Sequence, residues 1–222
     1  MGKNRYKCLI FDHDDTVVDS TASIHQPAFN AYLAVYRPGM SCSVEEYMLK
    51  NCDPGFIQMC YEDYGMTDEE LEEETIFWQN YVKDHIPTAY AGMREIMERQ
   101  LRQGGHICVI THSFEDTVRR DYRANGLPQP EIVFGWEQPK ERRKPSVWPV
   151  EEIMGRLGLE DGRELLMIDD LRPGYEMAKA AGLDFAAARW ANDIAQIDGF
   201  MLDMCGRIFK SVNELSEYLF LD

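Results

Sequence analysis

Short runs of apolar residues recur along the chain with no polar residue between them. They span residues 8–11, 107–110, 132–134, 165–168 and about 185–188. Strands that are buried on both faces of a sheet have this unbroken pattern. The segments between the last four runs have helical character and end at glycines. Strands that alternate with helices form parallel sheets with right-handed crossovers, so the pattern predicts an α/β core.

The segment from residue 20 to residue 86 has a different character, because it contains no run of the strand type. Residues 43–46 and 67–70 both have the spacing of a capping box, so each begins a predicted helix. We expect about four helices in this segment and no strand. The predicted domains are therefore residues 1–19 with 87–222 as the α/β core, and residues 20–86 as an inserted helical domain.

Composition and charge narrow the classes of partner. The chain has 222 residues, of which 45% are hydrophobic, enough for a sizeable core. Its 39 acidic side chains outnumber 23 basic ones and give a formal net charge of −16. Because such a surface repels phosphate backbones and anionic lipids, we expect neither nucleic acid nor membrane as a partner.

Cysteine use and targeting signals bear on the compartment. The six cysteines form no C-x-x-C pair, and we find neither a signal peptide nor a membrane-length apolar run. A reduced, cytoplasmic protein is therefore expected. We make no prediction of the oligomeric state.

Polar side chains directly follow three of the apolar runs. Asp12 and Asp14 follow the first run, Thr111 follows the second, and Asp169 with Asp170 ends the fourth. Because ligand sites of open α/β sheets lie outside the carboxyl ends of the strands, we expect these side chains to lie close together. Clustered carboxylates need a neutralising cation, and Mg²⁺ takes oxygen ligands. A cation such as Mg²⁺ would fit at this edge, although an acidic turn that caps a core strand is typical of the same local pattern.

The order of these residues resembles the motifs of the haloacid dehalogenase superfamily of phosphotransferases. That pattern is D-x-D-x-T after the first strand, Thr or Ser after the second, Lys before a later helix, and an acidic pair after the fourth. The matching residues are Asp12 with Asp14, Thr111, Lys144, and Asp169 with Asp170. The likeness extends from about Tyr6 to Tyr218. It implies a Rossmann-like parallel-sheet core with an inserted helical cap of the C1 type.

The resemblance also implies roles for these residues. Asp12 would be the nucleophile that forms an aspartyl-phosphate, and Asp14 the general acid and base. Thr111 would hydrogen-bond the phosphoryl group, and Lys144 would offset the gathered negative charge. The implied Mg²⁺ ligands are Asp12, Asp14 through its backbone carbonyl, Asp170, and Asp169 in support.

Several positions depart from the superfamily pattern or add to it. Asp15 stands where Gly is usual and adds a charge near the nucleophile. Gly174 stands where an Asp is frequent, which resembles the subgroup of β-phosphoglucomutase-like phosphatases. Trp190, after the fifth run, is interpreted as a packing aromatic. His112 beside the site and Lys50 in the cap are candidate substrate contacts, although Lys50 is also typical of a solvated surface lysine.

The predicted function is Mg²⁺-dependent hydrolysis of a small phosphorylated metabolite. Asp14 favours a phosphatase over the dehalogenases of the superfamily, which lack that second Asp. The first alternative is a phosphomutase that acts on a sugar phosphate. The second is a non-catalytic phosphoacceptor or binding protein; receiver-like signalling domains carry their acidic pair on the first strand, so the order of motifs here disfavours them.

Overall fold

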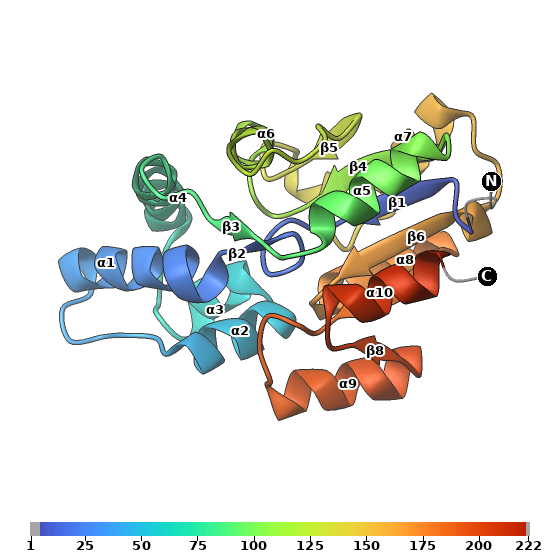
Figure 1. Ribbon diagram of the computed structural model, residues 1–222. Coiled ribbons are helices and arrows are strands. Elements are labelled where there is room, and N and C mark those ends of the chain that lie inside the picture. The colour runs from blue at the N-terminus through green and yellow to red at the C-terminus, as the bar shows by residue number, and fades with distance from the viewer. Residues whose placement is uncertain (1–4, 221–222) are drawn as a thin grey trace. The chain divides into compact units, whose positions relative to one another are not determined.

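The computed structural model describes residues 5–220 and has the expected alternation of strands and helices (Figure 1). Within these residues, six strands form one sheet in the order β5-β4-β1-β6-β7-β8, and all neighbouring strands run parallel. The strands are β1 Cys8–Phe11, β4 His106–Ile110, β5 Ile132–Phe134, β6 Leu165–Asp169, β7 Asp184–Ala188 and β8 Ile208–Phe209. The predicted α/β parallel-sheet fold is confirmed.

Helices cover both faces of this sheet, which explains the unbroken apolar runs. On β1, Leu9 and Phe11 belong to one core cluster, and Cys8 and Ile10 belong to the other. The first cluster includes residues from α5 Met93–Arg102, α6 Glu115–Ala124 and α10 Val212–Phe220. The second includes residues from α7 Trp148–Leu157 and α8 Arg172–Ala181. Every residue of β1 is fully buried.

Some elements were missed by sequence reasoning. Helix α9 Ala195–Cys205 and strand β8 follow β7, and neither was predicted. The residue before α9 is Ile194, which makes no side-chain capping bond, so the helix has no start signal. Strand β8 has only two residues, too few for a recognisable pattern. Two 3₁₀ turns, η2 Lys140–Arg142 and η3 Gly162–Glu164, complete this part of the chain.

Residues 19–88 form a second compact unit. Its elements are the π-helical turn η1 Thr21–His25 and the helices α1 Gln26–Tyr36, α2 Val44–Cys52, α3 Phe56–Glu62 and α4 Asp68–Val82. Both predicted capping boxes are present, at the starts of α2 and α4. Aromatic and sulfur-containing side chains such as Phe29, Tyr32 and Met59 form its core. Strands β2 Val18–Asp19 and β3 Thr88–Ala89 pair where the chain enters and leaves this unit.

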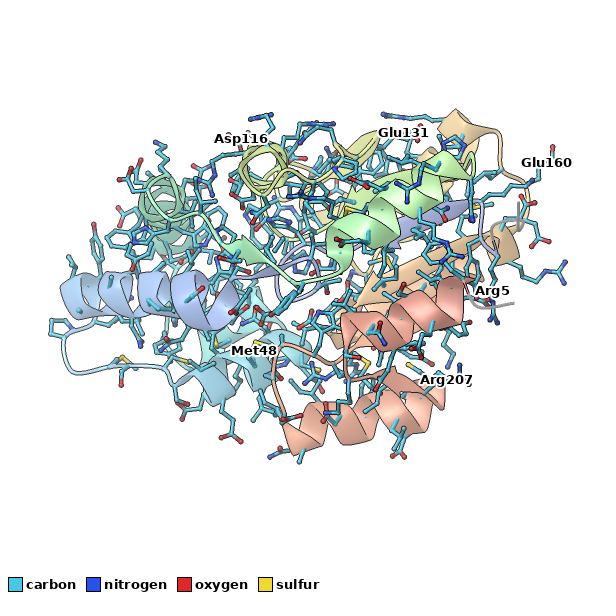
Figure 2. All side chains as sticks on the ribbon, in the orientation of Figure 1. Arg5, Met48, Asp116, Glu131, Glu160 and Arg207 are labelled. Carbon is cyan, nitrogen blue, oxygen red and sulfur yellow. The ribbon has the colours of Figure 1, made fainter. Side chains whose placement is uncertain are left out.

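Charged side chains lie mostly on the outside of the structure (Figure 2). Asp116, Glu131 and Glu160 are exposed examples. In the described range of residues 5–220, no helix has the length and apolar character needed to cross a membrane.

Candidate active site

The register of the central strands brings the predicted site residues to one edge of the sheet. Strand β1 lies between β4 and β6, where the order of strands along the sheet reverses. Phe11 pairs with Val109 on one side and with Ile168 on the other. The backbone N–H of Asp12 donates to the carbonyl of Ile168 at 2.8 Å. This is the switch point at which open α/β sheets bind ligands.

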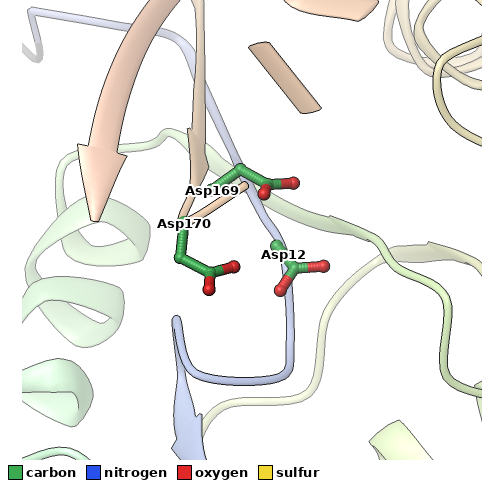
Figure 3. Close-up of side chains that lie close together, drawn as sticks. All are labelled: Asp12, Asp169 and Asp170. Atoms are coloured by element: carbon green, nitrogen blue, oxygen red, sulfur yellow. The ribbon is translucent and has the colours of Figure 1, made fainter. Parts of the chain in front are cut away.

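Three carboxylates meet at this point (Figure 3). Asp12, Asp169 and Asp170 each offer one oxygen, and these oxygens lie within 4.8 Å of one another. All three residues are at least 95% buried. Among the described residues, the Asp170 carboxylate has neither a hydrogen bond nor an ion pair, which is costly for a buried charge. A group of buried carboxylate oxygens, one of which belongs to a carboxylate without a protein partner, is suited to bind a divalent cation.

Lys144 neutralises part of this cluster. Its Nζ donates to Oδ1 of Asp12 at 2.6 Å and to Oδ2 of Asp169 at 2.7 Å. Burial disfavours the charged ammonium, but the two carboxylates outweigh that effect and raise the pKa of Lys144 above its ordinary value. The lysine therefore stays protonated and holds two of the acidic side chains together.

The pKa values of Asp12 and Asp170 are both raised above the usual range, and burial is the main cause for each of these carboxyls. Lys144 opposes the shift at Asp12, whereas the positive charge that opposes it at Asp170 is Arg189. A bound cation would favour the ionised form of both, because it adds positive charge beside them.

Asp169 has a supporting position. Its Oδ1 accepts a hydrogen bond from the backbone N–H of Leu171 at 2.9 Å, while its Oδ2 accepts from Lys144. Both oxygens of Asp169 are therefore engaged by the protein. The carboxylate of Asp170 in contrast stays available at the edge of the cluster.

Asp14 is held by a residue that sequence reasoning missed. The hydroxyl of Ser113 donates to Oδ2 of Asp14 at 2.6 Å. The backbone N–H of Ser113 donates to Oγ1 of Thr111 at 3.0 Å, so the loop after β4 contacts both residues. The side chain of Asp14 is not one of the three clustered carboxylates. The sequence signal that could have indicated this role is the hydroxyl of Ser113, two positions after Thr111.

His13 lies between the two motif aspartates and is fully buried. Its Nε2 lies 3.1 Å from Oδ2 of Asp121, and its ring stacks on that of Tyr122 at a centroid distance of 5.8 Å. These contacts connect the loop after β1 to α6. The partner lies 108 positions further along the chain, so no local pattern could indicate it.

Asp15 occupies the position where the superfamily pattern has Gly. Its φ of 56° lies in the left-handed region, the only such value for a non-glycine residue in the described chain. Asp tolerates this conformation better than most residues, because its short side chain can bond locally. The backbone N–H of Asp15 donates to the carbonyl of Val18 at 2.8 Å. The turn therefore forms with Asp in place of Gly.

The two candidate substrate contacts lie in different units. Solvent reaches the His112 ring, whose Nε2 lies 3.3 Å from the carbonyl of Lys144. Partial desolvation and the Lys144 charge lower the pKa of His112 to about 3, so the ring is neutral at pH 7. Lys50 lies on α2 in the helical unit, where its ammonium pairs with Asp63 at 2.6 Å.

The two residues that follow β7 donate hydrogen bonds to backbone carbonyls near the site. Arg189 is fully buried, and its Nη1 donates to the backbone carbonyl of Asp170 at 3.2 Å. Its Nε pairs with Asp198 at 2.7 Å. Trp190 packs against the core, as interpreted from the sequence, and its indole N–H also donates to the carbonyl of Thr16 at 3.2 Å. The role of Arg189 was missed, because a buried arginine has no sequence signature.

The fold of this chain is similar to those of several solved structures. Solved structures with similar folds include a predicted phosphoglycolate phosphatase from Haemophilus somnus, with 19% identity and a TM-score of 0.73 over 98% of this chain and 99% of that one. A conserved haloacid dehalogenase-like protein of unknown function from Agrobacterium tumefaciens has 15% identity and a TM-score of 0.73, covering 96% and 97%.

A further similar fold is that of CbbY from Rhodobacter sphaeroides in complex with xylulose-1,5-bisphosphate, with 19% identity and a TM-score of 0.69 over 95% and 96% of the two chains. No curated protein sequence matches. The family model of haloacid dehalogenase-like hydrolases matches residues 9–188, which include every core motif residue named above. The chain therefore belongs to the haloacid dehalogenase-like hydrolase family, as its motifs predicted.

Proposed function

We propose that the protein is an Mg²⁺-dependent phosphatase that hydrolyses a small phosphorylated metabolite through an aspartyl-phosphate on Asp12. One observation carries the proposal. The Asp12 carboxylate is bound by the Lys144 ammonium and lies beside the unpaired carboxylate of Asp170. Transfer of a phosphoryl group to a carboxylate requires a nucleophile, a fixed positive charge and carboxylate oxygens that can bind a cation, and all three lie at one edge of the sheet.

In the first proposed step, a carboxylate oxygen of Asp12 attacks phosphorus and the ester P–O bond breaks. Asp14, in its protonated form, gives its proton to the leaving oxygen, so the alcohol leaves neutral. The Ser113 hydroxyl fixes the carboxyl group of Asp14 in one orientation. The Lys144 ammonium stays beside Asp12 and offsets the negative charge of the incoming phosphate.

In the second step, the carboxylate of Asp14 removes a proton from a water molecule as that water attacks phosphorus. The bond between phosphorus and Asp12 breaks, inorganic phosphate leaves, and both residues return to their starting states. Thr111 supports the phosphoryl group in this proposal. Its Oγ1 accepts the N–H of Ser113 and keeps its own proton for an acceptor.

The residues fit the metal that the superfamily uses. Mg²⁺ would be held by the carboxylates of Asp12 and Asp170 and by the backbone carbonyl of Asp14, and when bound it supplies positive charge to the phosphoryl oxygens. Asp169 supports the site through its bonds to Lys144 and Leu171.

The helical unit, residues 19–88, is the proposed cap that selects the substrate. Lys50 is paired with Asp63, so contact with a substrate would require that pair to open. His112 is neutral and partly solvated, which suits a hydrogen bond to an uncharged part of the substrate. Since the proposed substrate is a small phosphorylated metabolite, a panel of such compounds should be tested.

The test is phosphate release from phosphorylated metabolites, measured with Mg²⁺ and with EDTA, for wild type and Asp12→Asn. Asp203→Asn, an exposed position on α9, is the matched control. We expect Mg²⁺-dependent release from a few compounds, its loss in Asp12→Asn and its retention in Asp203→Asn. Folded protein that binds Mg²⁺ and releases no phosphate would contradict the proposal. Isomerised sugar phosphates would then indicate a mutase, and a persistent phosphoprotein a non-catalytic acceptor.

A further inference from the structure

Arg143 precedes the site lysine and is held in a fixed position. Its guanidinium lies over the ring of Trp136, with Cζ 4.1 Å from the ring centroid. Its Nε donates to the carbonyl of Gln138 at 2.6 Å. The side chain is half-buried. A stacked and hydrogen-bonded guanidinium loses little further freedom when it binds a ligand, so this cation is preorganised.

Arg143 makes no ion pair and no hydrogen bond with a carboxylate among the described residues, although the charges of Glu137 and Glu141 act on its guanidinium and partly oppose the effect of burial, which lowers its pKa. The nearest acidic residues in the sequence are Glu137 and Glu141. Glu137 is engaged elsewhere, because its carboxylate accepts the backbone N–H groups of Gly135 at 2.9 Å and Glu115 at 3.2 Å. Glu141 is exposed to solvent. Among the described residues the two terminal nitrogens of Arg143 make no hydrogen bond, so an external anion can bind them.

A continuous series of contacts joins this arginine to the reacting centre. The Trp136 ring lies edge-on to the His112 ring at a centroid distance of 5.6 Å. Nε2 of His112 lies 3.3 Å from the carbonyl of Lys144, whose ammonium contacts Asp12 at 2.6 Å. All of these residues belong to the same compact unit. The Lys144 ammonium is occupied by Asp12 and Asp169, so Arg143 is the cation available to a second group of the substrate.

We propose that Arg143, stacked on Trp136, forms a second anion subsite beside the phosphoryl site, so that the preferred substrates are phosphomonoesters with a further anionic group. That group is a carboxylate or a second phosphate. Both have oxygen pairs that match the planar fork of a guanidinium, whereas a neutral hydroxyl gains far less from it. The inference rests on the proposed phosphatase activity and deepens it by naming the class of substrate.

The experiment compares matched pairs of substrates. The first pair is 2-phosphoglycolate and 2-hydroxyethyl phosphate, which differ in a carboxylate. The second pair is a sugar bisphosphate and the corresponding monophosphate, which differ in a phosphate. The kcat/KM ratio within each pair is measured for wild type, Arg143→Gln, Arg143→Lys and Arg142→Gln. Arg142 is the control, because it is the neighbouring cation, is exposed, and lies over a different ring, that of Trp148.

We expect wild type to prefer the more anionic member of at least one pair. Arg143→Gln should reduce that preference about tenfold to a hundredfold, mainly through KM, as for loss of a charged hydrogen bond. Arg143→Lys keeps the charge without the fork and should recover part of the preference, whereas Arg142→Gln should retain it. The pair that responds distinguishes a carboxylate from a second phosphate.

Three results would overturn the inference. The first is a wild-type enzyme that turns over both members of each pair equally. The second is an Arg143→Gln protein with an unchanged ratio. The third is an equal loss of preference in Arg142→Gln, which would indicate diffuse attraction by the basic loop. Failure of the phosphatase proposal looks different, because wild type would then hydrolyse no member of either pair. If Arg143→Gln does not fold, the Arg143→Lys ratio decides the question.

Discussion

The Asp169 carboxylate lies directly against the backbone of Gly174. A Cβ added at Gly174 would be 2.1 Å from Oδ2 of Asp169 and 2.3 Å from its Cγ. The same Oδ2 accepts the hydrogen bond from Lys144. The position that carries Gly in place of the more frequent acidic residue thus provides the space in which Asp169 can hold the lysine. Any larger residue at position 174 must displace this carboxylate or the first turns of α8.

Gly174→Ala should therefore destabilise the protein, although alanine favours helices. Helix propensity alone would add up to about 1 kcal/mol of stability. The overlap with Asp169 reverses the sign, and we expect a net loss of about 1–3 kcal/mol, typical of an overpacked core. Urea unfolding measures it. Gly155→Ala on α7 is the control, because no atom lies within 4 Å of its added Cβ. Equal stabilities for the two variants would contradict the packing argument.

Asp170→Asn should stabilise the metal-free protein and remove its response to Mg²⁺. The Asp170 carboxylate is buried, and burial raises its pKa, so the ionised form opposes folding when no cation is present. Replacement by a neutral amide should raise the metal-free stability at pH 7 by about 1–2 kcal/mol. Wild type should gain thermal stability with Mg²⁺, since a ligand that binds the folded state stabilises it.

Thermal unfolding with Mg²⁺ and with EDTA tests this pair of effects. The exposed variant Asp203→Asn should keep the wild-type response to Mg²⁺. A metal-free Asp170→Asn protein that unfolds at a lower temperature than metal-free wild type would show that the carboxylate has a stabilising partner in the folded state.

The core fold and the motif residues could be predicted, because their signals are local. Buried strands give unbroken apolar runs, and Asp12 and Asp170 directly follow strands β1 and β6. Contacts between distant segments could not be predicted. The Ser113 hydroxyl bonds a residue 99 positions away, and Arg189, which directly follows strand β7, donates to the carbonyl of Asp170. Such pairs depend on the register and packing of the folded sheet, which no local periodicity records.

Ser113→Ala should slow the proposed reaction without a large effect on substrate affinity. The variant removes the donor that lies 2.6 Å from Oδ2 of Asp14 and leaves the backbone N–H that bonds Thr111. We expect kcat to fall about tenfold with little change in KM, as for loss of one hydrogen bond to a charged group. Steady-state kinetics with the substrate found in the metabolite panel measure both constants. A rise in KM at unchanged kcat would instead place Ser113 in substrate binding, and Ser113→Thr should restore part of kcat.

Glu74 should make the stability of the protein depend on pH. It lies on α4 in the helical unit with only 3% of its surface exposed, and burial raises its pKa from 4.5 to about 8, opposed in part by His25. Between these values the folded state keeps a proton that the unfolded chain has lost. The free energy of unfolding therefore falls as the pH rises from about 4.5 to 8. Glu74→Gln removes this contribution, because the amide does not titrate.

At pH 8 the Glu74→Gln variant should be more stable than wild type by about 1–3 kcal/mol, and at pH 4.5 the two should be nearly equal. Urea unfolding at both pH values measures the difference. The control is Glu73→Gln, the adjacent exposed position on α4, which should follow wild type at both. The opposite sign, a variant less stable than wild type at pH 8, would mean that the ionised carboxylate gains more from the neighbouring His25 than it loses by burial.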